Sequence, residues 1–152
     1  MIEQIAPPAS QSVKSGELKI GIIVARQHVQ SINGMFSQVY EVLRQAGVEP
    51  EDLRVVSVPT ADDLASVART LVTGNFFDAI ICLGYATKNT ARLNMLVEGS
   101  PAQGLQWVAF YAGIPIIFCL TSAKSSQQDE EQIQRATECA HVAFRMARRS
   151  AS

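Results

Sequence analysis

The chain has 152 residues, a length that fits one domain, and 47% of them are hydrophobic, which is enough to bury a core. Charged residues make up 18%, with a formal net charge of -1, so the balance gives no indication of binding to nucleic acid or to an anionic membrane. Many apolar residues with few charges indicate that some apolar surface is buried against a partner subunit.

Residues 1–16 contain Pro7, Pro8 and several Ser and Gln residues, and we expect them to form a flexible N-terminal arm ahead of one domain over residues 17–150. Four later runs predict buried strands, because each is almost continuous in Ile, Val, Leu or Cys. That composition is typical of a parallel sheet covered on both faces. The runs are residues 19–24, 53–58, 78–83 and 114–119.

Helical periodicity fills the gaps between these strands. The first helix is expected to end at Gly47, a natural residue for a helix C-terminus. Thr60 and Asp63 resemble a capping box at the start of the second helix, with Asp in place of Glu. A third helix is expected over residues 89–112, kinked or broken at Ser100-Pro101, and a last one over residues 133–147.

This alternation of strands and helices predicts a single-domain, three-layer α/β/α sandwich built on a four-stranded parallel sheet. Right-handed crossovers place helices on both faces of such a sheet. Ligands of these sheets bind beyond the carboxyl ends of the strands. Any site should therefore be lined by the segments that follow the strands, which are residues 26–28, 59–63, 84–90 and 121–124.

Five stretches share their order and spacing with one known family. They are Val58-Pro59-x-Ala61, Asp78-Ala79-Ile80-Ile81-x-Leu83-Gly84, Gly104-Leu105, Gly113-Ile114-Pro115-Ile116-Ile117-Phe118, and Glu138-x-Ala140 with Ala143 and Met146. Together they resemble the lumazine synthase family over about residues 19–147. The resemblance implies a flavodoxin-like fold and a homopentamer, which in some members assembles into an icosahedral shell. It also implies sites between neighbouring subunits and a transferase reaction of riboflavin biosynthesis. In that reaction a ribitylamino-pyrimidine condenses with a four-carbon ketose phosphate.

The first two pocket segments depart from the pattern of that family. After the first strand the family has Arg-aromatic-Asn, and its aromatic ring stacks on the pyrimidine. Arg26 is kept here, but Gln27 replaces the ring and His28 replaces the Asn. In the second segment Asp63 takes the place of the Glu that binds the ribityl chain, and polar residues replace a Gly and a Phe beside it.

The third and fourth segments depart further. The family has Arg-Gly-Glu-Thr-x-His-Phe after the third strand, where Gly-Glu-Thr helps to cradle the phosphate and the His is the proposed proton shuttle. Residues 88–94 occupy those places, so the shuttle aligns with Leu93, which cannot transfer a proton. The family's phosphate-binding arginine after the fourth strand has no counterpart in residues 125–130.

These losses fall on the groups that carry the family's chemistry. Aromatic stacking contributes roughly 0.5–1.5 kcal/mol beyond area burial. A charge-assisted bond to phosphate contributes roughly 1.5–3 kcal/mol. A positioned acid–base group contributes a factor of about 10²–10⁴. Holding two substrates together is itself a large term, so loss of the shuttle alone need not abolish activity. Because all three groups are lost together, we expect lumazine formation to be weak or absent.

The candidate site residues come from these segments. His28 and Lys88 are the candidate catalytic groups, as a replacement proton shuttle and an anion-binding cation. The candidate ligand-binding residues are Arg26, Gln27, Thr60, Ala61, Asp62, Asp63, Tyr85, Thr87, Asn89, Thr90, Arg92 and Phe118. Several of these residues have a structural role as an alternative to the functional one. Asp63 is a helix cap or accepts from a ligand hydroxyl, Tyr85 packs at an interface or stacks on the ligand, and Lys88 and Arg92 are solvated charges or bind an anion.

No metal-ligand cluster and no glycine-rich phosphate loop occur, so the sequence predicts neither a metal nor a cofactor. The three cysteines, Cys82, Cys119 and Cys139, form no Cys-x-x-Cys pair and no even-numbered framework, and we expect them to be reduced. No apolar run is long enough to span a bilayer, and the N-terminus does not resemble a signal peptide. The expected location is the cytoplasm.

The leading hypothesis is a divergent family member that binds a small polar or heterocyclic ligand, similar to a pyrimidine or a pteridine, at subunit interfaces. It could catalyse a related condensation or proton transfer. Three alternatives stay open: a working lumazine synthase, a non-catalytic scaffold or shell-forming protein, and a relative of archaeal riboflavin synthase, which Val58-Pro59 followed by Asp63-Leu64 also resembles.

Overall fold

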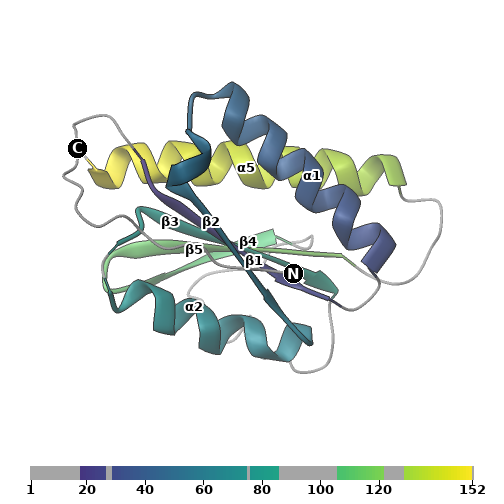
Figure 1. Cartoon of the computed structure of the whole chain (residues 1–152), viewed down its shortest axis with the longest axis horizontal. Helices are drawn as coiled ribbons and strands as arrows, with labels where there is room; N and C mark the ends of the chain where they lie inside the picture. Colours follow the sequence, from purple (N-terminus) through teal and green to yellow (C-terminus); the bar gives the residue numbers. More distant parts are fainter. Residues whose placement is uncertain (1–17, 27–28, 75, 86–105, 122–128, 152) are drawn as a thin grey trace.

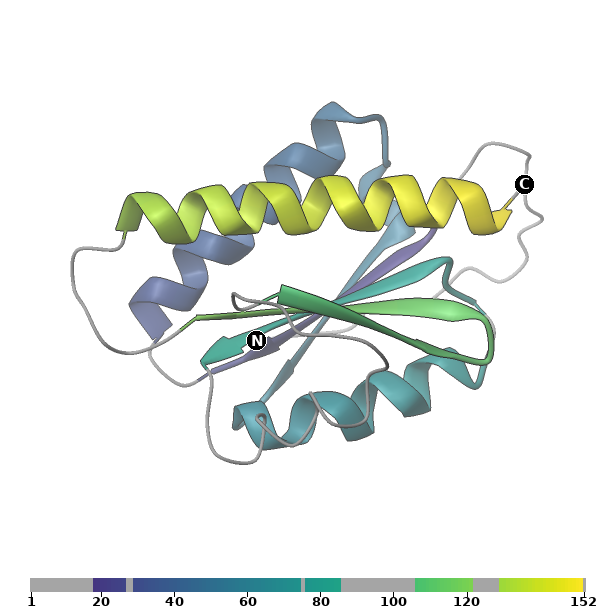
Figure 2. The ribbon, with the colours of Figure 1, turned by 180° about the vertical axis from the view of Figure 1, so that it is seen from behind.

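Five strands form one sheet, in the order β2-β1-β3-β5-β4, and helices cover both of its faces (Figure 1). Helices α1 and α5 lie on one face and α2 lies on the other, as the view from behind also shows (Figure 2). The computed structural model describes residues 18–26, 29–74, 76–85, 106–121 and 129–151. The expected arm over residues 1–16 lies outside these ranges.

The strands are β1 (Ile20–Ala25), β2 (Leu53–Val58), β3 (Ala79–Tyr85), β4 (Gln106–Tyr111) and β5 (Ile114–Thr121). The helices are α1 (Val29–Gln45), α2 (Leu64–Val72) and α5 (Asp129–Ala151), with short 3₁₀ helices η1 (Pro50–Asp52) and η2 (Ala61–Asp63). Strand β1 pairs in parallel with β2 and β3, and β3 pairs in parallel with β5. The predicted α/β fold is therefore confirmed, with parallel strands at the four expected places.

Strand β4 corrects the expected strand count and the expected third helix. Residues 106–111 pair antiparallel with β5, so the sheet has five strands and Trp107 lies on a strand. The turn between the two strands explains the difference. Ala112 and Gly113 have φ values of 55° and 81°, and a two-residue hairpin turn of type I′ requires positive φ at both positions. The part of the expected helix over residues 89–105 lies outside the described residues.

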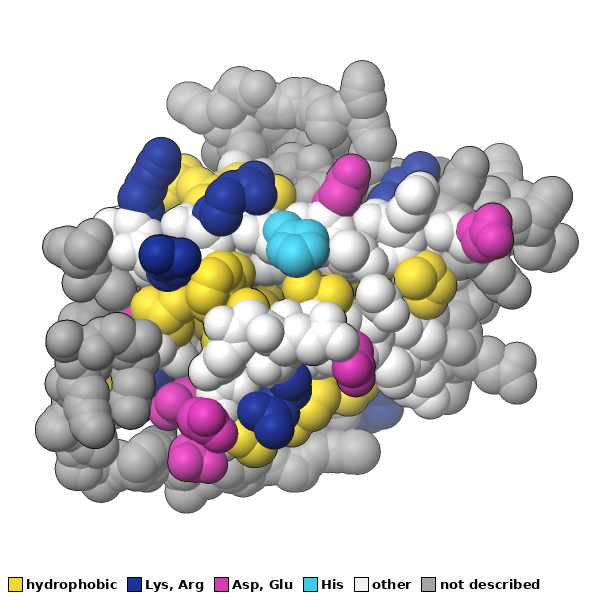
Figure 3. Space-filling view, turned by 90° about the horizontal axis from the view of Figure 1, so that it is seen from above, with side chains coloured by type: hydrophobic (Ala, Val, Ile, Leu, Met, Phe, Trp, Pro, Cys, Tyr) yellow, Lys and Arg dark blue, Asp and Glu magenta, His cyan; other side chains and the backbone are white. Residues whose placement is uncertain are grey.

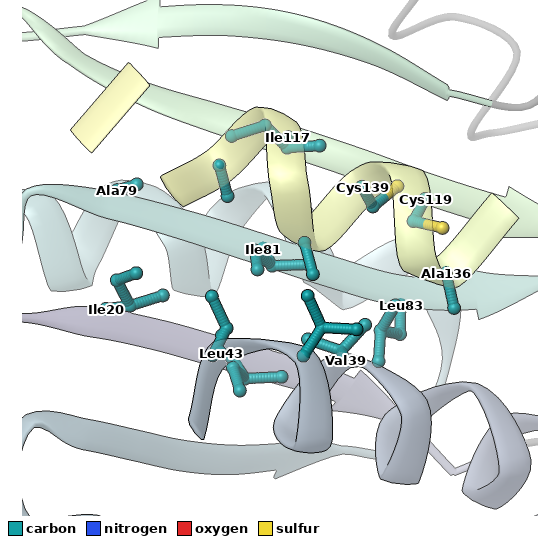
Figure 4. Close-up of a cluster of buried hydrophobic side chains, with 14 of the residues drawn as sticks. Ile20, Val39, Leu43, Ala79, Ile81, Leu83, Ile117, Cys119, Ala136 and Cys139 are labelled. Atoms are coloured by element: carbon teal, nitrogen blue, oxygen red, sulfur yellow. The ribbon is translucent and has the colours of Figure 1, made fainter. Parts of the chain in front are cut away.

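Two hydrophobic clusters hold the layers together, one on each face of the sheet. Figure 4 shows the larger cluster, where Val39 and Leu43 of α1 meet Ile81 and Leu83 of β3 below α5. Every residue of β3 is buried, because its side chains alternate between the two clusters. Burial on both faces explains why the strands are almost continuously apolar in the sequence.

All three cysteines are free and buried. Figure 4 shows the side chains of Cys119 of β5 and Cys139 of α5 next to each other in the larger cluster. Their spacing in the sequence does not reveal that they are neighbours. Burial raises the pKa of the Cys139 thiol well above its usual range, and the neighbouring Cys119 raises it further. Burial also raises the pKa of Cys82. The thiols of Cys82 and Cys139 therefore stay protonated, and all three cysteines pack in the core.

Helices α1 and α5 are amphipathic. In the space-filling view onto these helices, charged side chains spread over the outer surface and hydrophobic side chains fill the seam between them (Figure 3). Gln38 of α1 also donates a hydrogen bond of 2.9 Å to the Thr137 hydroxyl of α5 across this seam. Within the described residues, no helix is both long and apolar enough to cross a membrane.

A small polar cluster ties the amino-terminal ends of β1 and β3 together. The Lys19 backbone N–H donates to Asp78 Oδ2 at 2.9 Å, and the Asp78 N–H donates to the Lys19 carbonyl at 2.7 Å. Lys19 Nζ lies 3.2 Å from Asp52 Oδ1. Burial raises the pKa of the Asp78 carboxyl and outweighs the opposite effects of the hydrogen bond from Lys19 and of its charge. Ionisation of Asp78 is therefore less favourable in the folded protein than in the unfolded chain.

This direction gives a pH-dependent prediction for Asp78→Asn. A raised folded pKa means that the folded state binds the proton more tightly than the unfolded state, so the cost of burying the charge disappears as pH falls through that pKa. The amide keeps an oxygen for the Lys19 N–H and carries no charge. We expect Asp78→Asn to be at least as stable as wild type at pH 7, with an advantage that shrinks towards pH 4.

Chemical denaturation at both pH values measures this difference. Asp78→Ala is the control, because it removes the acceptor and should cost about 1–3 kcal/mol at either pH. An advantage of Asp78→Asn that does not change with pH would contradict the assignment.

Candidate functional site

The carboxyl ends of the four parallel strands meet along one edge of the sheet. Ala25 of β1 lies opposite Val58 of β2, and Tyr85 of β3 lies opposite Thr121 of β5. The chain leaves β1 through α1 towards β2 and returns through α2 to β3, so the connections diverge between β1 and β3. A crevice at such a reversal point is where open α/β sheets bind ligands. The described parts of the predicted segments, which are Arg26, residues 59–63, residues 84–85 and Thr121, therefore lie at this edge.

Arg26 is the first residue beyond β1 at this edge. Its backbone N–H donates to the Val58 carbonyl at 2.8 Å, which extends the pairing of β1 with β2. Its side chain is exposed and reaches back over β2, where Nη1 donates to the Ser57 hydroxyl at 3.2 Å. The guanidinium is thus held at the rim of the edge by a neutral partner.

The turn after β2 is closed by the predicted capping box. Asp63 Oδ2 accepts from the Thr60 backbone N–H at 3.3 Å and from the Thr60 hydroxyl at 3.1 Å. Thr60 is extended, with φ −137° and ψ 164°, and it starts the 3₁₀ helix η2 that leads into α2. This arrangement confirms the structural role that the sequence predicted for Asp63. A role in binding a ligand hydroxyl would have to share the same carboxylate.

Gly84 allows this turn to sit directly against the sheet. A Cβ atom at Gly84 would lie 3.1 Å from Leu64 Cδ1, 3.2 Å from Ala25 Cβ and 3.4 Å from Ala61 Cβ. The turn, β1 and β3 are therefore in close contact at the carboxyl edge, and Ala61 is buried between them. Because residues 61 and 84 are small, the turn that carries Asp62 and Asp63 lies close to the sheet.

Tyr85 and Phe118 lie on opposite faces of the sheet. Tyr85 belongs to the cluster beneath α1 and α5, whereas Phe118 belongs to the cluster on the α2 side. Their exposed fractions are 8% and 3%. Within a single chain these two rings do not line a common surface.

Seven of the candidate residues lie outside the described ranges. They are Gln27, His28, Thr87, Lys88, Asn89, Thr90 and Arg92. Both candidate catalytic groups are among them, and their roles stay predictions. Among the described residues, no cluster of His, Cys, Asp or Glu could hold a metal ion.

A hollow of about 300 Å³ lies beside Arg26, on the α1 side of the sheet. It is lined by Val24, Ala25, Arg26, Ile32, Asn33, Phe36, Val55 and Ser57, which we call the α1 groove. Of these, only Arg26 was a sequence-based candidate. The sequence holds one signal for the groove, since Ser57 interrupts the apolar residues of β2 on the face that carries Val55.

Comparison with known proteins identifies related sequences. The model of a protein family described as 6,7-dimethyl-8-ribityllumazine synthase matches residues 17–151. Proteins with that name include one from Azoarcus sp. (strain BH72), 28% identical over 86% of this chain and 84% of its own length. Others come from Paraburkholderia phymatum, at 30% over 86% of this chain and 74% of its own length, and from Burkholderia mallei, at 31%, 86% and 73%.

The capping box gives a prediction for Asp63. Asp63→Ala removes the acceptor of both Thr60 bonds and should cost about 0.5–2 kcal/mol of unfolding free energy. Asp63→Asn keeps a side-chain oxygen in place and should cost less than Asp63→Ala. Glu51→Ala, which removes an exposed carboxylate from the other 3₁₀ helix, η1, is the matched control. Urea denaturation ranks the three variants, and a loss for Asp63→Ala no larger than that for Glu51→Ala would contradict the cap as the cause.

Proposed function

This chain belongs to the 6,7-dimethyl-8-ribityllumazine synthase family, and we propose that it is a divergent member with a changed ligand site. Its site binds a small polar or heterocyclic ligand, similar to a pyrimidine or a pteridine, between the subunits of a homo-oligomer. Lumazine formation by this chain is weak or lost, and a related condensation or proton transfer takes its place. The protein acts in the cytoplasm.

One observation carries this proposal: the residues that match the family serve the scaffold, and the residues that differ belong to the pocket. Gly84 and Ala61 pack the turn against the sheet, and Asp78 links β1 to β3. By contrast, Gln27 and Leu93 stand where the family has its stacking ring and its proposed proton shuttle. A chain with the original chemistry would keep both groups, so the loss of the second group supports a changed ligand site on a retained scaffold.

The chemistry of the described edge supports a polar ligand. Arg26 contributes a cation, Thr60 a hydroxyl, and Asp62 and Asp63 two carboxylates, all within the segments that follow β1 and β2. Donors and acceptors of both signs suit a ligand with hydroxyl, carbonyl or amide groups. The capping box accounts for Thr60 and Asp63 on the pure scaffold hypothesis as well, so the support for a polar ligand comes mainly from Arg26 and from the replaced pocket residues.

The proposal predicts slow lumazine formation. With the ribitylamino-pyrimidine and the ketose phosphate as substrates, kcat/KM should lie at least about 10³-fold below that of an ordinary family member, because the acid–base and phosphate-binding groups are missing. The Paraburkholderia phymatum protein, assayed in parallel, is the reference. The double variant Gln27→Phe, Leu93→His restores a ring and an imidazole and should raise the rate. A wild-type rate within tenfold of the reference would identify the chain as a working synthase.

The proposal also predicts an oligomer. Multi-angle light scattering at micromolar concentration should give a mass of five chains or a multiple of five, because a site between subunits needs a neighbour. The low proportion of charged residues, 18%, fits burial of surface in such an assembly. A monomer would overturn the interface location of the site.

A further inference from the structure

The α1 groove is open because α1 does not lie squarely over β2. Helix α1 packs mainly against α5, β3 and β1. Val55 and Ser57 of β2 point to the same side of the sheet as α1, yet both are only half-buried. The hollow of about 300 Å³ lies between these two residues and the first turns of α1.

The walls of the groove are apolar and include one aromatic ring. Ile32 and Phe36 stand one helical turn apart on α1 and face Val24 and Val55 of the strands. Phe36 also contacts Tyr40, with ring centroids 5.8 Å apart and ring planes tilted by 45°, which restricts the orientation of the Phe36 ring. A flat apolar body fits between such walls.

The polar groups of the groove lie at one end. Arg26 Nη1 donates to the Ser57 hydroxyl at 3.2 Å, and the Asn33 side chain is exposed on the facing helix. In the described part of the chain, no carboxylate forms an ion pair with Arg26. A guanidinium presents several N–H donors in a planar fork that matches a carboxylate. The end of the groove therefore offers a cation for an anionic group.

We propose that the α1 groove binds a planar ring that carries a carboxylate. The ring lies against Phe36 and Val55, and the carboxylate accepts hydrogen bonds from Arg26 and Ser57. Pockets for small ligands span about 300–1,000 Å³, so this groove admits one or two fused rings. The inference rests on the proposed function, because it names the class of ligand. In this site the Phe36 ring of α1 provides the stacking surface that the family has at the position of Gln27.

Titration calorimetry with four ring compounds tests the inference on the assembled full chain. Orotate and pterin-6-carboxylate carry the carboxylate, and uracil and pterin are their analogues without it. The carboxylates should bind at least about tenfold more tightly than the analogues, as expected for a charge-assisted bond. Arg26→Gln should abolish this preference. Phe36→Leu should weaken all binding by about 3- to 10-fold, because it removes the stacking surface.

Two control variants change the same residue types elsewhere. Arg69→Gln removes an arginine from α2, where it lies over the Tyr111 ring, and Phe110→Leu removes an exposed ring from β4. Both should bind the carboxylates like wild type. Circular dichroism and light scattering on each variant identify any that is misfolded or disassembled. If Phe36→Leu fails to fold, Phe36→Tyr, which keeps the ring, and Val55→Ala test the wall instead.

The outcomes separate this inference from the proposed function. Equal affinity for carboxylates and neutral analogues, or carboxylate binding that survives both Arg26→Gln and Phe36→Leu, overturns the groove site. Binding that instead depends on Asp63, measured with Asp63→Asn and with ribitol as a second probe, would place the ligand at the turn after β2. The proposed function would then stand without the groove. Carboxylate binding lost in the groove variants of a chain that forms lumazine at an ordinary rate would support the groove and overturn the proposed divergence.

Discussion

Burial of β3 on both faces is the constraint on which the rest of the structure depends. All seven of its residues are buried, with Ile81 and Leu83 in the cluster beneath α1 and α5, and Ile80 and Cys82 on the α2 side. Because both faces of the central strands are filled, a ligand can contact the described part of the sheet where strands end or where a helix leaves a strand uncovered. The carboxyl edge is a site of the first kind, and the α1 groove is a site of the second kind.

Much of the fold could be predicted from the sequence, because burial on two sides leaves a clear apolar pattern. The four parallel strands and the capping box of Thr60 and Asp63 were predicted from local residues alone. Strand β4 was not, since Trp107, Val108 and Phe110 fit a buried helix as well as a strand. The deciding feature is the positive φ of Ala112, and alanine gives no signal of that conformation.

The site was less predictable, because its residues act through neighbours that are distant in sequence. Arg26 was identified from its place after β1, but its contact with Ser57 depends on how β1 and β2 pair. Phe36 carries a helical spacing that is the same for a core residue and for the wall of a groove. Its exposure follows from the tilt of α1 towards α5, which only the packing of whole helices determines.

The hairpin of β4 and β5 also bears on how the chain folds. Tyr111 and Ile114 pair across a turn of two residues, so this pairing closes a very short loop. The parallel pairs of β1, β2, β3 and β5 each need a long crossover before they can form. Local contacts form faster than contacts between distant segments. The hairpin can therefore assemble early and present β5 as a template, onto which β3, then β1 and then β2 add.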